Sequence, residues 1–397
     1  MSKTLPRTGS IWLQEAQLLK IENESIHESG PVSSGSQIER REFLLLRIIW
    51  PKKKKVSRLY SMHENNPHVK LAKSFLNDGP IRPMWEKYIK SIQSAQGLGA
   101  INPHELGTFS LVRYHQLQTK DWNYGNSGTR SKVDFSPIAG RTRSQTARDP
   151  TTPTRASTNP GIDALFKDLG IDNTPPSGKS SMSSPFTPLG QGDTYYPPGA
   201  NSGAVVDEQI VNTALIEYLN ALAIHYPELE ADWTLHRLPL IAQNGDRGKT
   251  YEARIDGYLR RRDDGMPLVI LEVKPYQRSW KRDEVRMQEG AQMAAWINRY
   301  PPRNLENMRT PNKKDRRLLI SQDRDEIYLT FAEFDADYVD YVCHKPIDPH
   351  EPRRPRSFLT MTEYGPFDVG NRKAMKKLGE LVLGLALGAC REMLTNQ

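Results

Sequence analysis

Asp256, Glu272 and Lys274 are the residues whose types and spacing are best suited to chemistry. Glu272 and Lys274 lie two positions apart in the run VILEVK, so on a β-strand their side chains point to the same face. Pairing with the preceding strand would bring Asp256 beside them. Two carboxylates and an ammonium on one patch suit a divalent cation and a phosphodiester.

A turn separates the two runs that carry these residues. Asp263, Asp264, Gly265 and Pro267 interrupt the strand-like runs ARIDGYL and LVILEVK. Clusters of Asp, Gly and Pro between such runs are typical of hairpin turns. The sequence therefore predicts a β-hairpin within residues 251–276.

Amphipathic helices are expected on both sides of the hairpin. Residues 205–226 carry apolar side chains at the three- and four-residue spacing of a buried helix, which Pro227 ends. A second helix is expected at 283–299, before Pro301. Between the first helix and the hairpin, residues 233–243 are predicted to form one strand.

More strands and a last helix are expected after residue 317. Residues 318–320, 326–334 and 357–364 have strand character, and residues 371–393 form a strongly apolar helical pattern. Helices and strands in this order predict an α/β or α+β fold, with a central sheet flanked by helices.

Composition divides the chain into four predicted parts. Residues 1–37 are polar and are expected to be disordered. Residues 38–124 are expected to form a small α+β module of unknown role, with a strand at 108–117. Residues 125–203, rich in Ser, Thr, Pro and Gly, predict a disordered linker. The main domain is expected at 204–397.

One segment of the predicted linker has helical periodicity. Residues 161–172 (GIDALFKDLGID) place four apolar side chains on one helical face. This pattern is compatible with a protein-binding segment that folds on contact, or with chance.

Charge and cysteine content limit the function classes. The net charge of +8 favours nucleic acid or another polyanion as partner. Two cysteines, Cys343 and Cys390, exclude a disulfide framework and a Cys-based zinc site. The N-terminus lacks the apolar segment of a secretory signal, and the longest apolar run, 381–389, is too short to span a bilayer. We expect an intracellular protein with no membrane segment, and this run suits a core or an oligomer interface equally.

A short basic motif, PKKKKV at residues 51–56, matches a nuclear localisation signal. The alternative is a solvated charge cluster at a turn. The basic residues of 313–317 are a second, weaker candidate.

The pattern Asp256, fifteen residues, then Glu272-Val273-Lys274 resembles the active site of the PD-(D/E)xK nuclease superfamily. Across residues 205–393 the chain is similar to fungal nuclease-like members of that group. The resemblance implies a restriction-endonuclease-like core with a mixed central sheet. It also implies a metal site with Mg²⁺ or Mn²⁺ held by Asp256, Glu272 and the Val273 backbone carbonyl. Proline is absent before the aspartate, since Ile255 stands there.

Further site residues follow from the resemblance. The superfamily often has a glutamine on the helix after the hairpin, which favours Gln288, with Gln292 one turn later as the second choice. Glu208 matches an additional acidic residue of the first helix. The alternatives are a polar seam for the two glutamines and a capping role for Glu208.

These residues predict a metal-dependent nuclease that hydrolyses phosphodiester bonds in nucleic acid, with DNA as the expected substrate. Lys274 would orient the attacking water or stabilise the transition state. The first alternative is a catalytically inactive nuclease-fold protein that serves as a nucleic-acid-binding or protein-interaction adaptor. The second is that Asp256 and Glu272 form ordinary surface salt bridges with Lys274 and the arginines at 260–262.

Overall fold

The structure is a computed structural model, and it describes residues 4–28, 32, 34–92, 101–120, 207–244, 248–343 and 357–395. The linker predicted at 125–203 and the segment at 161–172 lie outside the described residues. Met1–Asp121 and Val205–Gln397 belong to one compact unit, to which all the elements below belong.

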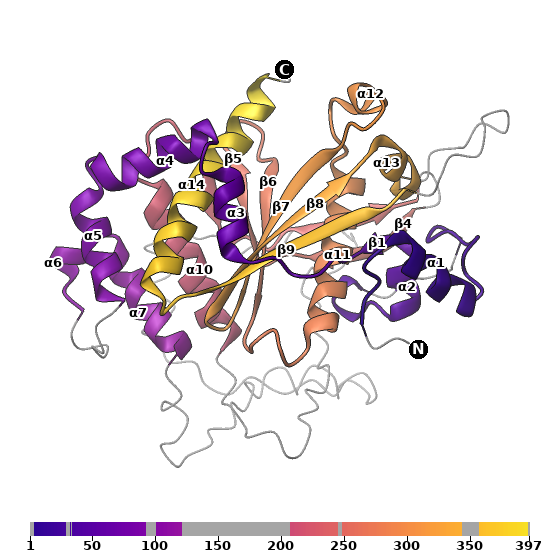
Figure 1. Cartoon of the computed structure of the whole chain (residues 1–397), viewed down its shortest axis with the longest axis horizontal. Helices are drawn as coiled ribbons and strands as arrows, with labels where there is room; N and C mark the ends of the chain where they lie inside the picture. Colours follow the sequence, from indigo (N-terminus) through magenta and orange to yellow (C-terminus); the bar gives the residue numbers. More distant parts are fainter. Residues whose placement is uncertain are drawn as a thin grey trace, which may run out of the picture. The chain divides into compact units, whose positions relative to one another are not determined.

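A seven-stranded mixed sheet forms the centre of this unit (Figure 1). In spatial order its strands are β1 (Ile48–Ile49), β9 (Leu359–Asp368), β8 (Glu326–Phe334), β7 (Asp315–Asp323), β6 (Pro267–Lys274), β5 (Gly257–Arg261) and β2 (Ala231–Thr234). The pairs β6–β7 and β1–β9 are parallel, and the other pairs are antiparallel. This arrangement confirms the predicted α/β class with a central sheet.

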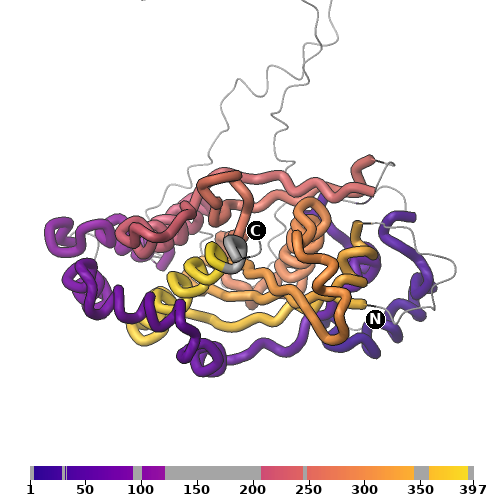
Figure 2. Tube along the Cα trace, turned by 90° about the horizontal axis from the view of Figure 1, so that it is seen from above, coloured from indigo at the N-terminus to yellow at the C-terminus, as the bar shows by residue number. Residues whose placement is uncertain are grey.

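One face of the sheet is covered by the first and last helices of the predicted main domain together with helices from the N-terminal part. The helices in contact with the sheet are α10 (Glu208–Ala223), α14 (Arg372–Thr395) and α3 (Val56–His63). Packed on α10, α14 or one another are α4 (Pro67–Asp78), α5 (Arg82–Ser91), α6 (Pro103–Leu106) and α7 (Phe109–Lys120). Figure 2 shows the violet helix α4 beside the yellow helix α14, which it contacts. Leu271 and Val273 of β6 are buried in this core.

The other face is covered by α11 and a set of shorter elements. These are α11 (Arg282–Arg299), α1 (Gly9–Leu18), η1 (Gly35–Gln37), α2 (Arg40–Leu45), α12 (Leu305–Met308), α13 (Ala336–Val342) and the separate hairpin of β3 (Pro239–Gln243) with β4 (Lys249–Arg254). Ile270 belongs to this second core. Because side chains alternate along β6, Glu272 and Lys274 also face α11.

Most elements predicted for the main domain are confirmed. The helices expected at 205–226, 283–299 and 371–393 correspond to α10, α11 and α14, and the hairpin corresponds to β5–β6. The single strand predicted at 233–243 is wrong. Its two ends lie in β2 and β3, which belong to different sheets.

The predicted disorder of residues 1–37 is wrong for the described residues 4–28. Helix α1 forms there, and Trp12 is 2% exposed, donates its indole N–H to the Leu44 carbonyl at 2.8 Å, and packs edge-on against Phe358. Low local hydrophobicity suggested disorder, but the partners of this segment come from distant parts of the chain.

The separate module predicted at 38–124 does not form as such. Its residues lie in the same compact unit as residues 205–397, and β1 pairs with β9 of the main sheet. The strand predicted at 108–117 is instead α7, whose buried residues recur at helical spacing and include Phe109, Val112 and Gln116. Aromatic and β-branched residues in that run favoured a strand by composition, whereas burial follows the helical period.

The apolar run 381–389 lies in the core. Leu381, Val382 and Leu383 are buried against α4 and the sheet. A Cβ at Gly384 would lie 2.6 Å from the Val69 Cα, so the absence of a side chain permits α14 to pack closely on α4. Among the described helices, none is long and apolar enough to cross a membrane.

Candidate active site

The β5–β6 hairpin brings the three predicted residues together at the end of β6. The Asp256 backbone N–H donates to the Leu271 carbonyl at 3.0 Å, and Gly257 is the partner of Leu271 in the sheet register. Asp256 therefore lies beside the last residues of β6. A tight turn closes the hairpin, in which Gly265 adopts a φ of 72°.

Asp256 is held by contacts from three other segments. It is 8% exposed, its Oδ2 accepts the Val273 backbone N–H at 3.0 Å, and its Oδ1 is 3.1 Å from the Arg237 guanidinium. Asn212 of α10 donates to the Asp256 backbone carbonyl at 3.1 Å. The carboxylate is thus fixed against the edge of β6 that carries Glu272.

Glu272 is almost fully buried, with 1% of its surface exposed. Its Oε1 is paired with the Lys274 ammonium and accepts from Gln288 Nε2 at 2.6 Å. Its Oε2 accepts from Gln292 Nε2 at 2.5 Å. The structure therefore brings both candidate glutamines of α11 to the same carboxylate.

The two glutamines differ in burial and in partners. Gln292 is 0% exposed and also donates to the Arg254 backbone carbonyl at 2.8 Å, while its Oε1 is buried without a hydrogen-bond partner. Gln288 is half-buried. Gln292, the second choice from the sequence, is thus the more deeply fixed of the two.

Burial governs the ionisation of this cluster. Loss of hydration raises the pKa of Glu272 to about 8, and Asp256 adds to the rise while Lys274 opposes it. Burial acts to lower the pKa of Lys274, but the carboxylates of Glu272, Asp256 and Glu208 outweigh it, and the net shift is upward. Lys274 therefore stays cationic at neutral pH, and at Glu272 the effect of burial on the pKa exceeds that of the Lys274 charge.

Glu208 lies at the edge of the cluster. Arg237 bridges the two acidic groups, with 3.1 Å to Glu208 and 3.1 Å to Asp256. Desolvation raises the pKa of Glu208, and Lys274 and Asp256 are its next largest influences. The side chain of Asp207 caps α10 by accepting the Gln209 N–H, and Glu208 lies in the first turn, where its negative charge suits the helix dipole.

The arginines at 260–262 do not pair with the candidate site. Arg260 and Arg262 pair with Asp232, and Arg261 pairs with Asp264 in the hairpin turn. The proposal of ordinary surface salt bridges to these arginines therefore fails for Asp256 and Glu272, both of which are buried.

The residues at this end of β6 offer oxygen donors that suit a hard cation. Asp256 and Glu272 provide carboxylate oxygens, and the Val273 N–H bonded to Asp256 places the carbonyl of the same residue on that edge of the strand. These are the oxygen donors that Mg²⁺ and Mn²⁺ prefer. Within the described residues, no group of three or more His, Cys, Asp or Glu side chains is arranged to hold a metal.

Sequence reasoning missed two polar residues of the site. Arg237 and Asn212 contact Asp256 from the segment after β2 and from α10. Neither residue has a local signal in the sequence, because an arginine between a histidine and a leucine and an asparagine in a helix are both ordinary.

A second buried network lies next to the site and was also missed. Arg278 is 1% exposed and pairs with Glu289, with Asp323 at 2.5 Å and with Glu363 at 2.8 Å, and its guanidinium lies 4.2 Å from the centre of the Tyr328 ring. Burial raises the pKa of Glu289 to about 7. Arg278 thus ties the loop after β6 to α11, β7 and β9.

Comparisons with protein-family models, with curated proteins and with solved structures gave no match to this chain.

Proposed function

We propose that this protein is a metal-dependent nuclease-like hydrolase that cleaves phosphodiester bonds in nucleic acid, with DNA as the expected substrate. The observation that carries the proposal is the buried Glu272, which lies with Lys274 and Asp256 at one end of β6. An ionisable group in an apolar strand needs a charged or metallic partner. In this proposal the mixed sheet corresponds to a restriction-endonuclease-like core.

The proposed metal is Mg²⁺ or Mn²⁺, held by Asp256, Glu272 and the Val273 carbonyl. When bound, such a cation offsets charge on the scissile phosphate and lowers the pKa of the attacking water. The chain's own residues do the rest. Gln288 and Gln292 hold the two oxygens of Glu272 in place, and the Val273 N–H holds Asp256.

Lys274 has the role of a fixed cation. Its ammonium keeps its proton beside three carboxylates, so it is suited to orient water by hydrogen bonding and to stabilise negative charge in the transition state. It is poorly suited to act as a general base, because its raised pKa disfavours the neutral amine.

Cleavage by the purified full-length chain tests the proposal. Single-stranded DNA, double-stranded DNA and RNA are incubated with Mg²⁺, with Mn²⁺ or with EDTA. Asp256→Asn, Glu272→Gln and Lys274→Met should each lower cleavage by roughly 10²-fold or more. Glu333→Gln is the matched control. Its exposed pair with Arg316 lies at the end of β8 that is remote from the site, because Lys274 is aligned through Asp323 with Glu326 at the opposite end. Failure to cleave any of these substrates with either metal would refute the catalytic proposal.

A specific observation favours the adaptor as a second candidate. One oxygen of each carboxylate already has a cationic partner, Arg237 for Asp256 and Lys274 for Glu272. In a protein without catalytic activity, these ion pairs would occupy the carboxylates in place of a metal ion. Calorimetric titration with Mn²⁺ separates the two candidates. A nuclease should bind Mn²⁺ and lose this binding in Glu272→Gln, whereas an adaptor should show no Mn²⁺ binding that depends on Glu272.

A further inference from the structure

Two adjoining clefts share Pro51, Lys52 and Lys53, and the first of them lies beside the N-terminus of α11. The first has a volume of about 440 Å³ and the second about 510 Å³. Together they are lined by nine basic residues against two acidic ones, Asp283 and Glu284. The basic residues are Arg7, Lys52, Lys53, Lys54, Lys55, Arg58, Lys281, Arg282 and Arg286. We call this surface the basic cleft.

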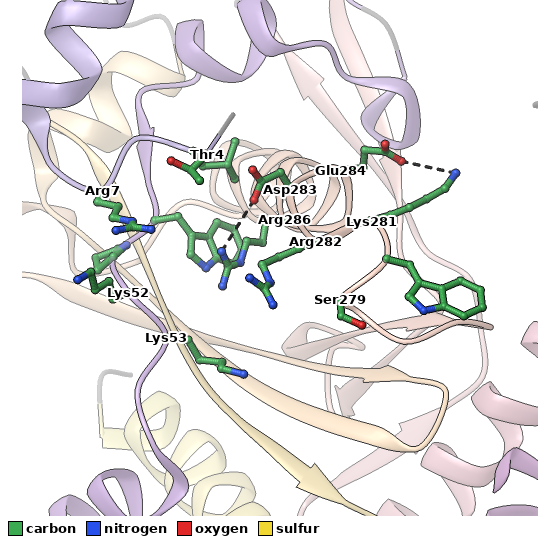
Figure 3. Close-up of a pocket in the computed structure, with 14 residues that line it drawn as sticks. Thr4, Arg7, Lys52, Lys53, Ser279, Lys281, Arg282, Asp283, Glu284 and Arg286 are labelled. Carbon is green, nitrogen blue, oxygen red and sulfur yellow. Dashed lines mark ion pairs between the residues drawn. The ribbon is translucent and has the colours of Figure 1, made fainter. Parts of the chain in front are cut away.

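Several cations of the basic cleft lack a carboxylate partner. Within the described part of the chain, Arg7, Lys52 and Arg282 form no ion pair, whereas Lys281 pairs with Glu284 and Arg286 with Glu363. Figure 3 shows Arg7, Lys52 and Lys53 on one side, opposite Arg282 and Arg286 of α11. Unpaired cations on two facing elements favour a polyanion that lies between them.

The basic segment at 51–55 is part of the sheet edge. The Lys54 backbone N–H donates to the Glu363 carbonyl at 2.8 Å, and its carbonyl accepts from the Gly365 N–H at 3.3 Å. The preceding Trp50 N–H donates to the Pro6 carbonyl at 2.7 Å. The backbone of this run is thus held at Trp50 and Lys54, while the side chains of Lys52, Lys53 and Lys55 are exposed. Short lysine runs serve either as nuclear localisation signals or as nucleic-acid-binding patches. Attachment of the run to the sheet edge favours nucleic-acid binding.

An exposed aromatic ring lines the same cleft. Trp280 is 47% exposed, whereas the other tryptophans among the described residues are 5% exposed or less. Base stacking on such a ring is a main source of affinity for single strands, and it is combined with cationic grooves that follow the backbone. A paired base in a duplex cannot offer its face to the ring.

We infer that the basic cleft binds single-stranded nucleic acid, with phosphates along Lys52, Lys53 and Arg282 and a base stacked on Trp280. The inference rests on the proposed function in one respect, because the basic cleft would supply the path of the substrate to the site at Glu272. Arg282 begins the helix that carries Gln288, six residues or about 9 Å further along the axis. A strand in the cleft would therefore lead across the start of α11 towards Glu272.

Binding is measured with the full-length chain carrying Glu272→Gln, in EDTA, so that cleavage cannot interfere. A fluorescent thymidine oligonucleotide is titrated at several salt concentrations. Lys52→Gln/Lys53→Gln should raise Kd about tenfold at low salt and reduce the slope of log K against log salt by roughly 1.4, because two phosphate contacts are lost. Lys313→Gln/Lys314→Gln is the control, with the same charge change at two exposed lysines outside the cleft.

Trp280→Ala tests the stacking part. It should raise Kd roughly tenfold without changing the salt slope, and Trp280→Phe should recover most of the affinity. Titration with the oligonucleotide should quench tryptophan emission in the chain with Trp280 and not in the Phe variant.

Three results would overturn the inference. They are equal binding by the two double-lysine variants, unchanged binding by Trp280→Ala, and binding to phosphatidylserine vesicles that competes with the oligonucleotide. If the wild-type chain binds the oligonucleotide but cleaves no substrate, the proposed function alone is contradicted. Cleavage that the double-lysine and Trp280 variants leave unchanged would contradict this inference alone.

Discussion

Gln292 and Glu272 are joined in the interior, where the Gln292 amide nitrogen donates to Glu272 Oε2 at 2.5 Å. The same nitrogen donates to the Arg254 carbonyl at 2.8 Å. One side chain of α11 therefore fixes both the candidate metal-binding carboxylate and the strand that leads to Asp256.

Replacement of Gln292 by Leu should destabilise the protein. The change leaves the buried Glu272 oxygen and the Arg254 carbonyl without their donor, which costs about 1–3 kcal/mol. Gln288→Leu should cost less, because Gln288 is half-buried and water can replace it. Urea unfolding of the two variants measures the difference, and equal losses would show that Gln292 is not the structural anchor.

The metal-free protein should lose stability as the pH rises from about 5 to 8 because of Glu272. Its pKa in the folded state is raised to about 8, above the ordinary value of 4.5 for a glutamate. The folded state therefore retains a proton that the unfolded state releases, and stability falls through this range by at most ~5 kcal/mol. Glu289 adds a slope of the same sign, since its pKa is raised to about 7.

The comparison of Glu272→Gln with the wild type isolates this effect. The neutral amide cannot titrate, so the free energy of unfolding of the variant, relative to that of the wild type, should rise with pH. Addition of Mn²⁺ should stabilise the wild type at pH 8 and leave the variant unchanged. A difference between the two proteins that does not vary with pH would contradict the raised pKa of Glu272.

Arg278→Met should be among the most destabilising single changes in this chain. It leaves Glu289, Asp323 and Glu363 buried without their shared cation, and breaking a buried pair costs about 3–5 kcal/mol. Arg262→Met, which removes an exposed pair with Asp232, should cost less than about 1 kcal/mol. Chemical denaturation compares the two, and a similar cost for both would argue against the buried network.

Gly384→Ala and Gly388→Ala should differ although both lie on α14. At Gly384 the new Cβ would meet the Val69 backbone at 2.6 Å, which forces α4 and α14 apart and costs roughly 1–3 kcal/mol. At Gly388 the nearest atom is a side-chain carbon of His68 at 3.3 Å, and the higher helix propensity of alanine offsets the contact. Thermal unfolding should rank the Gly388 variant above the Gly384 variant.

The parts of the site that follow local rules could be predicted from the sequence. The period of two on β6 places Glu272 with Lys274, the Asp-Gly turn predicts the hairpin, and the helical period places Gln288 with Gln292. Each of these relationships spans only a few residues or one tight turn. Backbone geometry alone therefore sets them.

The remaining features depend on contacts between distant segments. Arg237, between β2 and β3, pairs with Asp256, between β4 and β5. Arg278 gathers carboxylates from α11, β7 and β9, and Trp12 contacts Phe358 next to β9. The fold of residues 108–117 into α7 follows from burial against α10 and α5, which overrides a strand-like composition. Such pairings depend on which strands and helices become neighbours, and that choice lies in the packing of the whole chain.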